Sequence, residues 1–172
     1  MRVENKRYVY GLDLAWSTGI AIYDLEEDKF VYVSSCDAKK TKLRAQEKRD
    51  GLLEHGKKLR TLAVFLEDLF NEYPPSQIVI EKAFAGQFKN AVISLSKVHG
   101  MVNEMTADIP CVYYTPPEIK KAIIKGGADK EVIAKVISAK YNYLTFKNDD
   151  ESDATAVALT YLIKNNLIKW EK

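Results

Sequence analysis

Three short segments near the N-terminus constrain the fold most strongly. Residues 7–14, 19–24 and 30–36 are rich in Tyr, Val and Ile, and short polar turns at 17–19 and 26–29 separate them. Short β-prone segments joined by tight turns predict three antiparallel strands that follow one another as a meander. A chain that begins in this way needs further elements to cover the sheet, so the order of the later segments decides the fold class.

Helical and strand-like segments alternate after this meander. Leucine spacing predicts a helix over about 50–72, which Pro74 and Pro75 stop. Residues 77–81 are nearly all apolar, as expected for a central strand covered on both faces. Further segments predict a strand at 110–114 and helices at about 88–106, 116–124, 130–141 and 151–165. We therefore predict an α/β chain with a mixed five-stranded sheet, an antiparallel three-strand meander plus parallel strands, flanked by helices, as in the ribonuclease-H-like fold. The length of 172 residues predicts one domain over 1–172.

The small net charge of +2 hides a basic segment at residues 38–60. Nine cations in this segment face three acids, which indicates either a polyanion partner on one face or a solvated, mobile connection. The N-terminus lacks the apolar region of a signal peptide, and no run of about 18 apolar residues is present, so we expect a cytoplasmic protein. Cys36 and Cys111 lie in apolar, strand-like segments and are expected to be reduced core thiols.

Four carboxylates lie where acidic residues have no evident structural reason to be. Asp13 interrupts an apolar strand, Glu81 ends another, and Asp150 and Asp153 stand three residues apart at the start of an apolar helix. Acidic residues are seldom buried without a partner. In the predicted fold the first strand lies beside the fourth, and the i, i+3 spacing places the last two acids on one helix face. Taken singly, a strand-end Asp is usually a cap or turn residue, and the helical pair also suits capping and the helix dipole.

Taken together, these four acids predict a metal site. Four oxygen ligands without a His or Cys cluster suit Mg²⁺, with Mn²⁺ able to substitute, and do not suit zinc. Two such ions about 3.5–4 Å apart stabilise the attacking and leaving oxygens of a phosphodiester displacement. The sequence therefore indicates a metal-dependent nuclease.

The motifs resemble those of the RuvC-type Holliday junction resolvases over nearly the whole chain. The resemblance rests on Gly11-Leu12-Asp13 with Thr18-Gly19 after it, on Ile80-Glu81-Lys82-Ala83-Phe84, and on Asp150-Glu151-Ser152-Asp153-Ala154. It implies that Asp13, Glu81, Asp150 and Asp153 are catalytic metal ligands in a crossover junction endodeoxyribonuclease. The segment between the meander and the helix at 50 is longer and more basic than in the bacterial enzymes, and Trp16 replaces the small residues usual in the first turn, which indicates a phage-type or divergent member. We expect Trp16 to pack on a neighbouring loop, with stacking on nucleic acid as the alternative.

The resemblance also implies roles for cations and for one aromatic residue. Lys120 and Lys130, the latter across a one-residue gap, align with functional lysines that bind phosphate, and Lys121 is an alternative to Lys120. Phe84 aligns with an aromatic residue that stacks on bases, the alternative being a core residue at a strand-to-helix turn. We count Lys89 among the expected DNA contacts.

The implied partner is branched DNA, especially four-way junctions, cut by paired nicks. Two symmetric nicks imply a homodimer, with the helix at 88–106 as part of the interface. The interface stripe would be Ala91, Leu95, Val98 and Val102, and the alternative is that all four pack on the sheet. The setting would be a bacterial or phage-infected cell, and a branch-migration motor partner is left open. The alternatives are a nuclease for RNA–DNA hybrids or RNA, an actin-type phosphate-binding fold, for which 172 residues are too few, and a DNA-binding module without catalysis.

Overall fold

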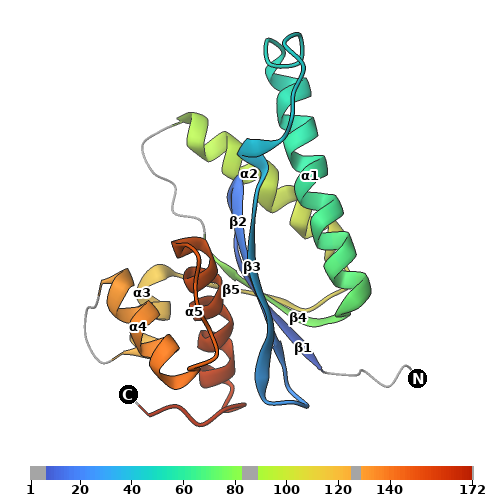
Figure 1. Cartoon of the computed structure of the whole chain (residues 1–172). Helices are drawn as coiled ribbons and strands as arrows, with labels where there is room; N and C mark the ends of the chain where they lie inside the picture. The colour runs from blue at the N-terminus through green and yellow to red at the C-terminus, as the bar shows by residue number, and fades with distance from the viewer. Residues whose placement is uncertain (1–6, 83–88, 125–128, 172) are drawn as a thin grey trace.

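The computed structural model describes residues 7–82, 89–124 and 129–171, and for residues 89–91 only the backbone. Five strands and five α-helices occur in these ranges (Figure 1). In chain order the elements are β1 (Tyr8–Asp13), β2 (Ser17–Asp24), β3 (Lys29–Asp37), the 3₁₀ turn η1 (Ala38–Lys40), α1 (Gly51–Glu72), β4 (Pro75–Glu81), α2 (Lys89–Met105), β5 (Cys111–Tyr114), α3 (Pro116–Ile123), α4 (Lys130–Lys140) and α5 (Asp149–Lys164).

One sheet with the strand order β3-β2-β1-β4-β5 organises the molecule. The first three strands pair antiparallel, whereas β4 pairs parallel to β1 and β5 parallel to β4. The meander and the parallel additions are therefore as the sequence predicts. Two boundaries differ from the prediction: β2 already begins at Ser17, within the predicted turn, and β4 begins at Pro75 directly after the helix stop.

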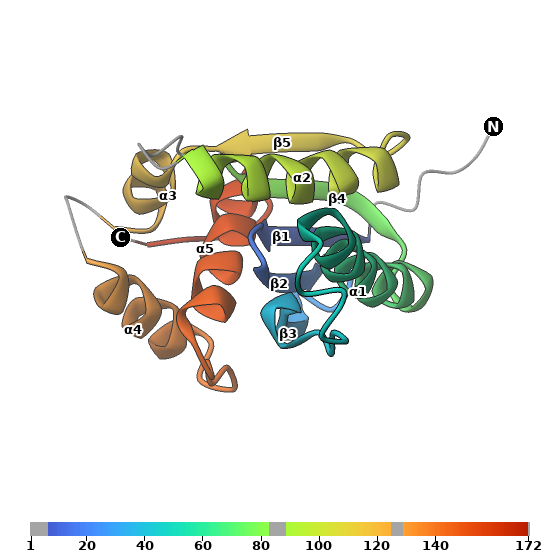
Figure 2. The same ribbon diagram turned by 90° about the horizontal axis from the view of Figure 1, so that it is seen from above.

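Helices cover both faces of the sheet, with α1 and α2 on one face and α3, α4 and α5 on the other (Figure 2). Side chains alternate between these faces along each strand. Tyr10, Leu12, Ile78 and Ile80 thus join the core under α1 and α2. Val9 and Val79 join the core under α5. Because both faces of β1 and β4 are covered, these strands read as almost continuous apolar runs in the sequence.

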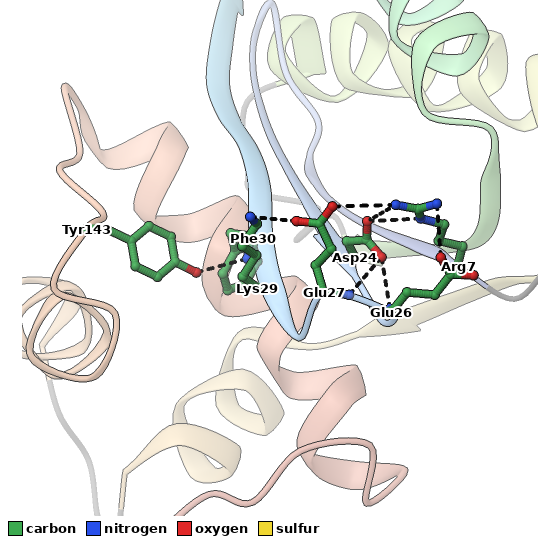
Figure 3. Close-up of polar contacts among 7 residues, drawn as sticks. All are labelled: Arg7, Asp24, Glu26, Glu27, Lys29, Phe30 and Tyr143. Atoms are coloured by element: carbon green, nitrogen blue, oxygen red, sulfur yellow. Dashed lines mark hydrogen bonds and ion pairs between the residues drawn. The ribbon is translucent and has the colours of Figure 1, made fainter.

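The end of the sheet where β1 begins carries a closed ion-pair cluster (Figure 3). The side chain of Asp24 is only 1% exposed and accepts two hydrogen bonds from the Arg7 guanidinium, at 2.7 and 2.9 Å. The amide N–H groups of Glu26 and Glu27 donate to the other Asp24 oxygen. Burial raises the pKa of Asp24, but these hydrogen bonds outweigh it and hold the pKa below its ordinary value.

Two further predictions concern the cysteines and membrane-spanning segments. Cys36 and Cys111 are both free, but Cys111 is exposed on the edge strand β5, so its predicted core position is wrong. Among the described residues, no helix is long and apolar enough to cross a membrane.

Candidate active site

Asp13 and Glu81 end two neighbouring parallel strands. Leu12 of β1 pairs with Ile80 of β4, so the last residues of the two strands, Asp13 and Glu81, lie at the same end of the sheet. Gly11, two residues before Asp13, faces α5, and β-strand alternation places Asp13 on that same face. Val79 belongs to the core under α5, so Glu81 follows on the same face. The two carboxylates thus come from distant parts of the chain to one end of the sheet.

Two glycines allow α5 to reach this end of the sheet. A Cβ added to Gly11 would lie 2.2 Å from the carbonyl oxygen of Ala154, and one added to Gly19 would lie 1.9 Å from that of Asp150. A side chain at either position would collide with helix backbone, so only glycine permits this approach. The first turn of α5, which carries Asp150, therefore lies against β2 beside Asp13.

The polar partners of the two α5 carboxylates differ. The Ser17 hydroxyl, at the start of β2, donates a hydrogen bond to Asp150. The Lys130 ammonium, at the start of α4, donates to Asp153 and forms an ion pair with it. The N-cap of α5 is Asn148, whose side-chain oxygen accepts the Glu151 N–H at 3.1 Å. Capping is therefore supplied by another residue and does not account for Asp150.

The half-buried carboxylates of this group repel one another. Burial, together with the charges of Glu81, Asp153 and Asp150, raises the pKa of Asp13 to about 7, although Lys130 opposes the shift. Burial and Asp153 also raise the pKa of Glu81. Burial lowers the pKa of Lys130, but its hydrogen bond to Asp153 and the charges of Asp13 and Glu81 outweigh that effect and raise it. The four carboxylates thus carry more negative charge than Lys130 neutralises, and either a proton or a cation relieves the excess.

The donor set of this site suits a hard divalent cation. All four candidate ligands are carboxylates, which Mg²⁺ and Mn²⁺ prefer. Among the described residues, no three acidic, His or Cys side chains are close enough together to hold a metal ion as they stand. Asp153 is engaged with Lys130 and Asp150 with Ser17. The chemistry of the residues fits a metal, while ligation would require these side chains to turn toward a common point.

The other predicted residues are placed less completely. Lys120 is half-buried and Lys121 exposed on α3. Phe84 lies outside the described residues, and so does the side chain of Lys89, the first residue of α2. Val98 and Val102 of α2, at 1% and 0% exposed, are buried on the sheet, so the alternative to the predicted interface stripe is correct for both.

Ser17 is the site residue that sequence reasoning missed. The composition of the triplet from Ser17 to Gly19 predicts a turn, whereas the structure makes it the first residues of β2. The pairing of Asp13 with Gly19 shows that this strand starts beside the catalytic candidate. A hydroxyl four residues after the strand-end Asp, in a chain that returns antiparallel, was the available signal.

Solved structures share this architecture across nearly the whole chain. Thermus thermophilus RuvC in complex with a Holliday junction substrate superposes with a TM-score of 0.73 at 16% identity and covers 94% of this chain and 96% of its own. The yeast mitochondrial Holliday junction resolvase gives 0.64 at 12% identity and covers 94% of this chain and 80% of its own. At these identities the likeness supports the ribonuclease-H-like fold, as predicted.

Curated sequences and a family model add the relationship. RuvC of Stenotrophomonas maltophilia is 30% identical over 107 residues, 60% of this chain and 62% of that protein, so the chain spans less than two thirds of that relative. RuvC of Pelobacter propionicus is 27% identical over 123 residues, 70% of each chain. The family model described as crossover junction endodeoxyribonuclease RuvC matches residues 30–161, a range that contains Glu81, Asp150 and Asp153 and begins after Asp13. With three quarters of its length matched by that model and the fold in agreement, the chain belongs to the RuvC family.

Proposed function

We propose that this protein is a metal-dependent endonuclease that hydrolyses phosphodiester bonds at four-way DNA junctions by paired nicks. The observation that carries the proposal is that three separate segments bring four carboxylates to one end of the sheet. Gly11 and Gly19 make the approach of α5 possible. The substrate class comes from the relatives, which are named crossover junction endodeoxyribonucleases, and from the Holliday junction bound to the Thermus thermophilus protein.

Asp13, Glu81, Asp150 and Asp153 would hold the metal, which we propose is Mg²⁺, with Mn²⁺ as a substitute. When bound, such ions supply a hydroxide nucleophile at neutral pH and stabilise the leaving 3′ oxygen. The raised pKa of Asp13 and of Glu81 supports this assignment, because a divalent cation would relieve the repulsion that contributes to both shifts.

Within the chain, Ser17 orients Asp150 by its hydrogen bond, and Lys130 holds Asp153 in its resting position. The Lys130 ammonium stays protonated, since the neighbouring carboxylates raise its pKa, and it can pass from Asp153 to a phosphate oxygen. By family resemblance we assign phosphate contacts to Lys120, Lys121 and Lys89. We assign base stacking to Phe84.

A homodimer would place two such sites on opposite strands of one junction. The buried stripe of α2 is not available for this interface, but Ile93 on the same helix is 51% exposed. We place the enzyme in the cytoplasm of a bacterial or phage-infected cell.

The test is incubation of the purified chain with a fixed four-way junction, a flap and an RNA–DNA hybrid in Mg²⁺, with the nicks mapped at nucleotide resolution. Paired nicks at symmetric positions on the junction are expected. Cleavage of the hybrid alone would replace this proposal by an RNA-directed nuclease, and no cleavage of any substrate in Mg²⁺ or Mn²⁺ would contradict it.

A further inference from the structure

Residues 38–60, which we call the basic arm, run from η1 through a turn at 41–50 into the first turns of α1. The arm's acids are mostly engaged: Glu47 pairs with Lys57 at 2.5 Å, and Glu54 pairs with Lys58. Among the described residues, six cations of the arm are exposed and have no carboxylate partner, namely Lys39, Lys42, Arg44, Lys48, Arg49 and Arg60. The arm therefore presents a net positive surface.

Part of this surface is hollowed. A hollow of about 630 Å³ is lined by Lys39, Thr41, Lys42, Leu43, Lys48, Glu54 and Lys58. The ion pair between Glu54 and Lys58 neutralises its one acid. Lys39, Lys42 and Lys48 are left as uncompensated cations around a concave surface, an arrangement that suits phosphate groups.

The arm is held on α1 by specific contacts. Glu47 accepts the Arg44 N–H at 2.8 Å in addition to the Lys57 ammonium, and the hydroxyls of Thr41 and Thr61 lie 3.0 Å apart. These contacts fix the turn at 41–50 to the helix that follows it. Of the two interpretations of this segment from sequence, they favour a built surface over a mobile connection.

The same segment is joined to the candidate active site through Trp16, three residues after Asp13. The Ala38 N–H donates to the Trp16 carbonyl oxygen at 2.7 Å. The Trp16 ring packs against His55 of α1 at 5.3 Å between centroids, and Lys97 of α2 contacts His55 Nδ1 at 2.7 Å. The Trp16 ring thus packs on helix α1, whereas from the sequence we expected it to pack on a neighbouring loop. Figure 1 places the arm beyond the end of the sheet at which α5 begins.

We propose that the basic arm is a second nucleic-acid contact, which binds the phosphate backbone of a duplex arm away from the point of cleavage. The inference rests on the proposed function for the identity of the polyanion. The hollow formed by Lys39, Lys42 and Lys48 receives phosphates, and the Trp16–His55 contact fixes its position relative to Asp13. Long duplex arms gain affinity from this surface, while a junction with arms too short to reach it is bound by the active-site region alone.

The test compares Lys42→Gln/Lys48→Gln with the control Lys135→Gln/Lys169→Gln, which removes two lysines from α4 and the C-terminal segment. Binding to four-way junctions with long and with short arms is measured over a range of salt. For junctions with long arms, the slope of log K against log salt should be less negative in the Lys42/Lys48 variant by up to about 1.8, or roughly 0.9 for each phosphate that the variant no longer neutralises. Lys42→Arg/Lys48→Arg should restore the wild-type slope.

On short arms, the Lys42/Lys48 variant should bind and nick as the wild type does. An unchanged slope on long arms, or an equal loss in the control variant, would overturn the inference. Wild-type nicking of the short-armed junction tests the proposed function separately: if it fails while the slope difference persists, the arm binds nucleic acid and the junction assignment is at fault.

Discussion

Two aspartates at opposite ends of the same sheet have opposite electrostatic environments. Asp24, beside the start of β1, is buried, yet its pKa lies below the ordinary value because Arg7 and two backbone amides bind it. Asp13, at the end of β1, is only half-buried, yet its pKa is raised to about 7 by burial and by its acidic neighbours. Burial raises both pKa values, so the opposite directions come from the partners, which outweigh burial at Asp24 and add to it at Asp13.

The two ends of the sheet differ in how their acids are paired. In the Asp24 cluster each carboxylate has a cation partner, because Arg7 also reaches Glu26 at 3.0 Å and Lys29 pairs with Glu27 (Figure 3). The Asp13 group sets four carboxylates against Lys130, which pairs with Asp153. The proposed function assigns this second set of acids to a ligand that brings positive charge.

The largest difference between the two ends of the sheet is expected in the nicking rate when carboxylates are exchanged for amides. Asp13→Asn or Glu81→Gln should lower the junction nicking rate by roughly 10³-fold, because several kcal/mol of metal-dependent stabilisation is lost. Junction binding should be retained. Asp24→Asn is the control and should nick at the wild-type rate under conditions where it is folded. Loss of binding by Asp13→Asn would point to a folding role for this residue.

A side chain at Gly19, which lies against the first turn of α5, should push α5 and its carboxylates away from Asp13. Gly19→Ala places a Cβ against the Asp150 carbonyl and should cost about 3 kcal/mol in the free energy of unfolding, measured by urea denaturation. Gly56→Ala, on α1 with nothing within 4 Å, should instead stabilise the protein by about 1 kcal/mol. Equal effects of the two substitutions would show that the close approach of α5 is not required.

The two aspartates should affect stability over different pH ranges in metal-free protein. Between pH 3.8 and about 7, folded Asp13 binds a proton that the unfolded chain has lost, so stability falls as the pH rises. Asp24, with a lowered pKa, contributes stability above pH 3.8 that is lost as the pH falls through its folded pKa.

Urea denaturation in chelator over this range measures both effects. At pH 8, Asp13→Asn should be more stable than the wild type by about 1–2 kcal/mol, and Asp24→Asn less stable by about 2 kcal/mol. Adding Mg²⁺ should remove the advantage of Asp13→Asn. A destabilised Asp13→Asn at pH 8 would contradict the assignment of excess charge to this site.

The smallest effect is expected for the Ser17 hydroxyl, which binds an acid of the site. Ser17→Ala removes the donor to Asp150 and should raise the Mg²⁺ concentration for half-maximal nicking by about tenfold, as the loss of an orienting partner of a metal ligand does. Ser17→Thr keeps the hydroxyl and serves as the control. An unchanged Mg²⁺ requirement would remove Ser17 from the site.

Periodicity and breaker residues predict most of the fold. Leucine spacing and Pro74 bound α1 correctly, and the apolar run ending in Glu81 is the central strand that its composition predicts. Ser17 is misplaced by sequence because a Ser-Thr-Gly triplet has turn composition, whereas tertiary pairing with β1 and β3 draws it into β2. Cys111 is misplaced because an apolar segment does not reveal that its strand lies at the sheet edge.

By itself the sequence determined the order of the elements and which four carboxylates interrupt apolar segments, since both are local properties of the chain. Only the tertiary structure decided which charges meet. The parallel pairing of β1 and β4 places Asp13 beside Glu81. Gly19 allows the backbone of Asp150 to approach β2, and Lys130 forms an ion pair with Asp153. The physical reason is that Coulomb interaction and desolvation depend on distance and burial in space, which residue spacing along the chain does not contain.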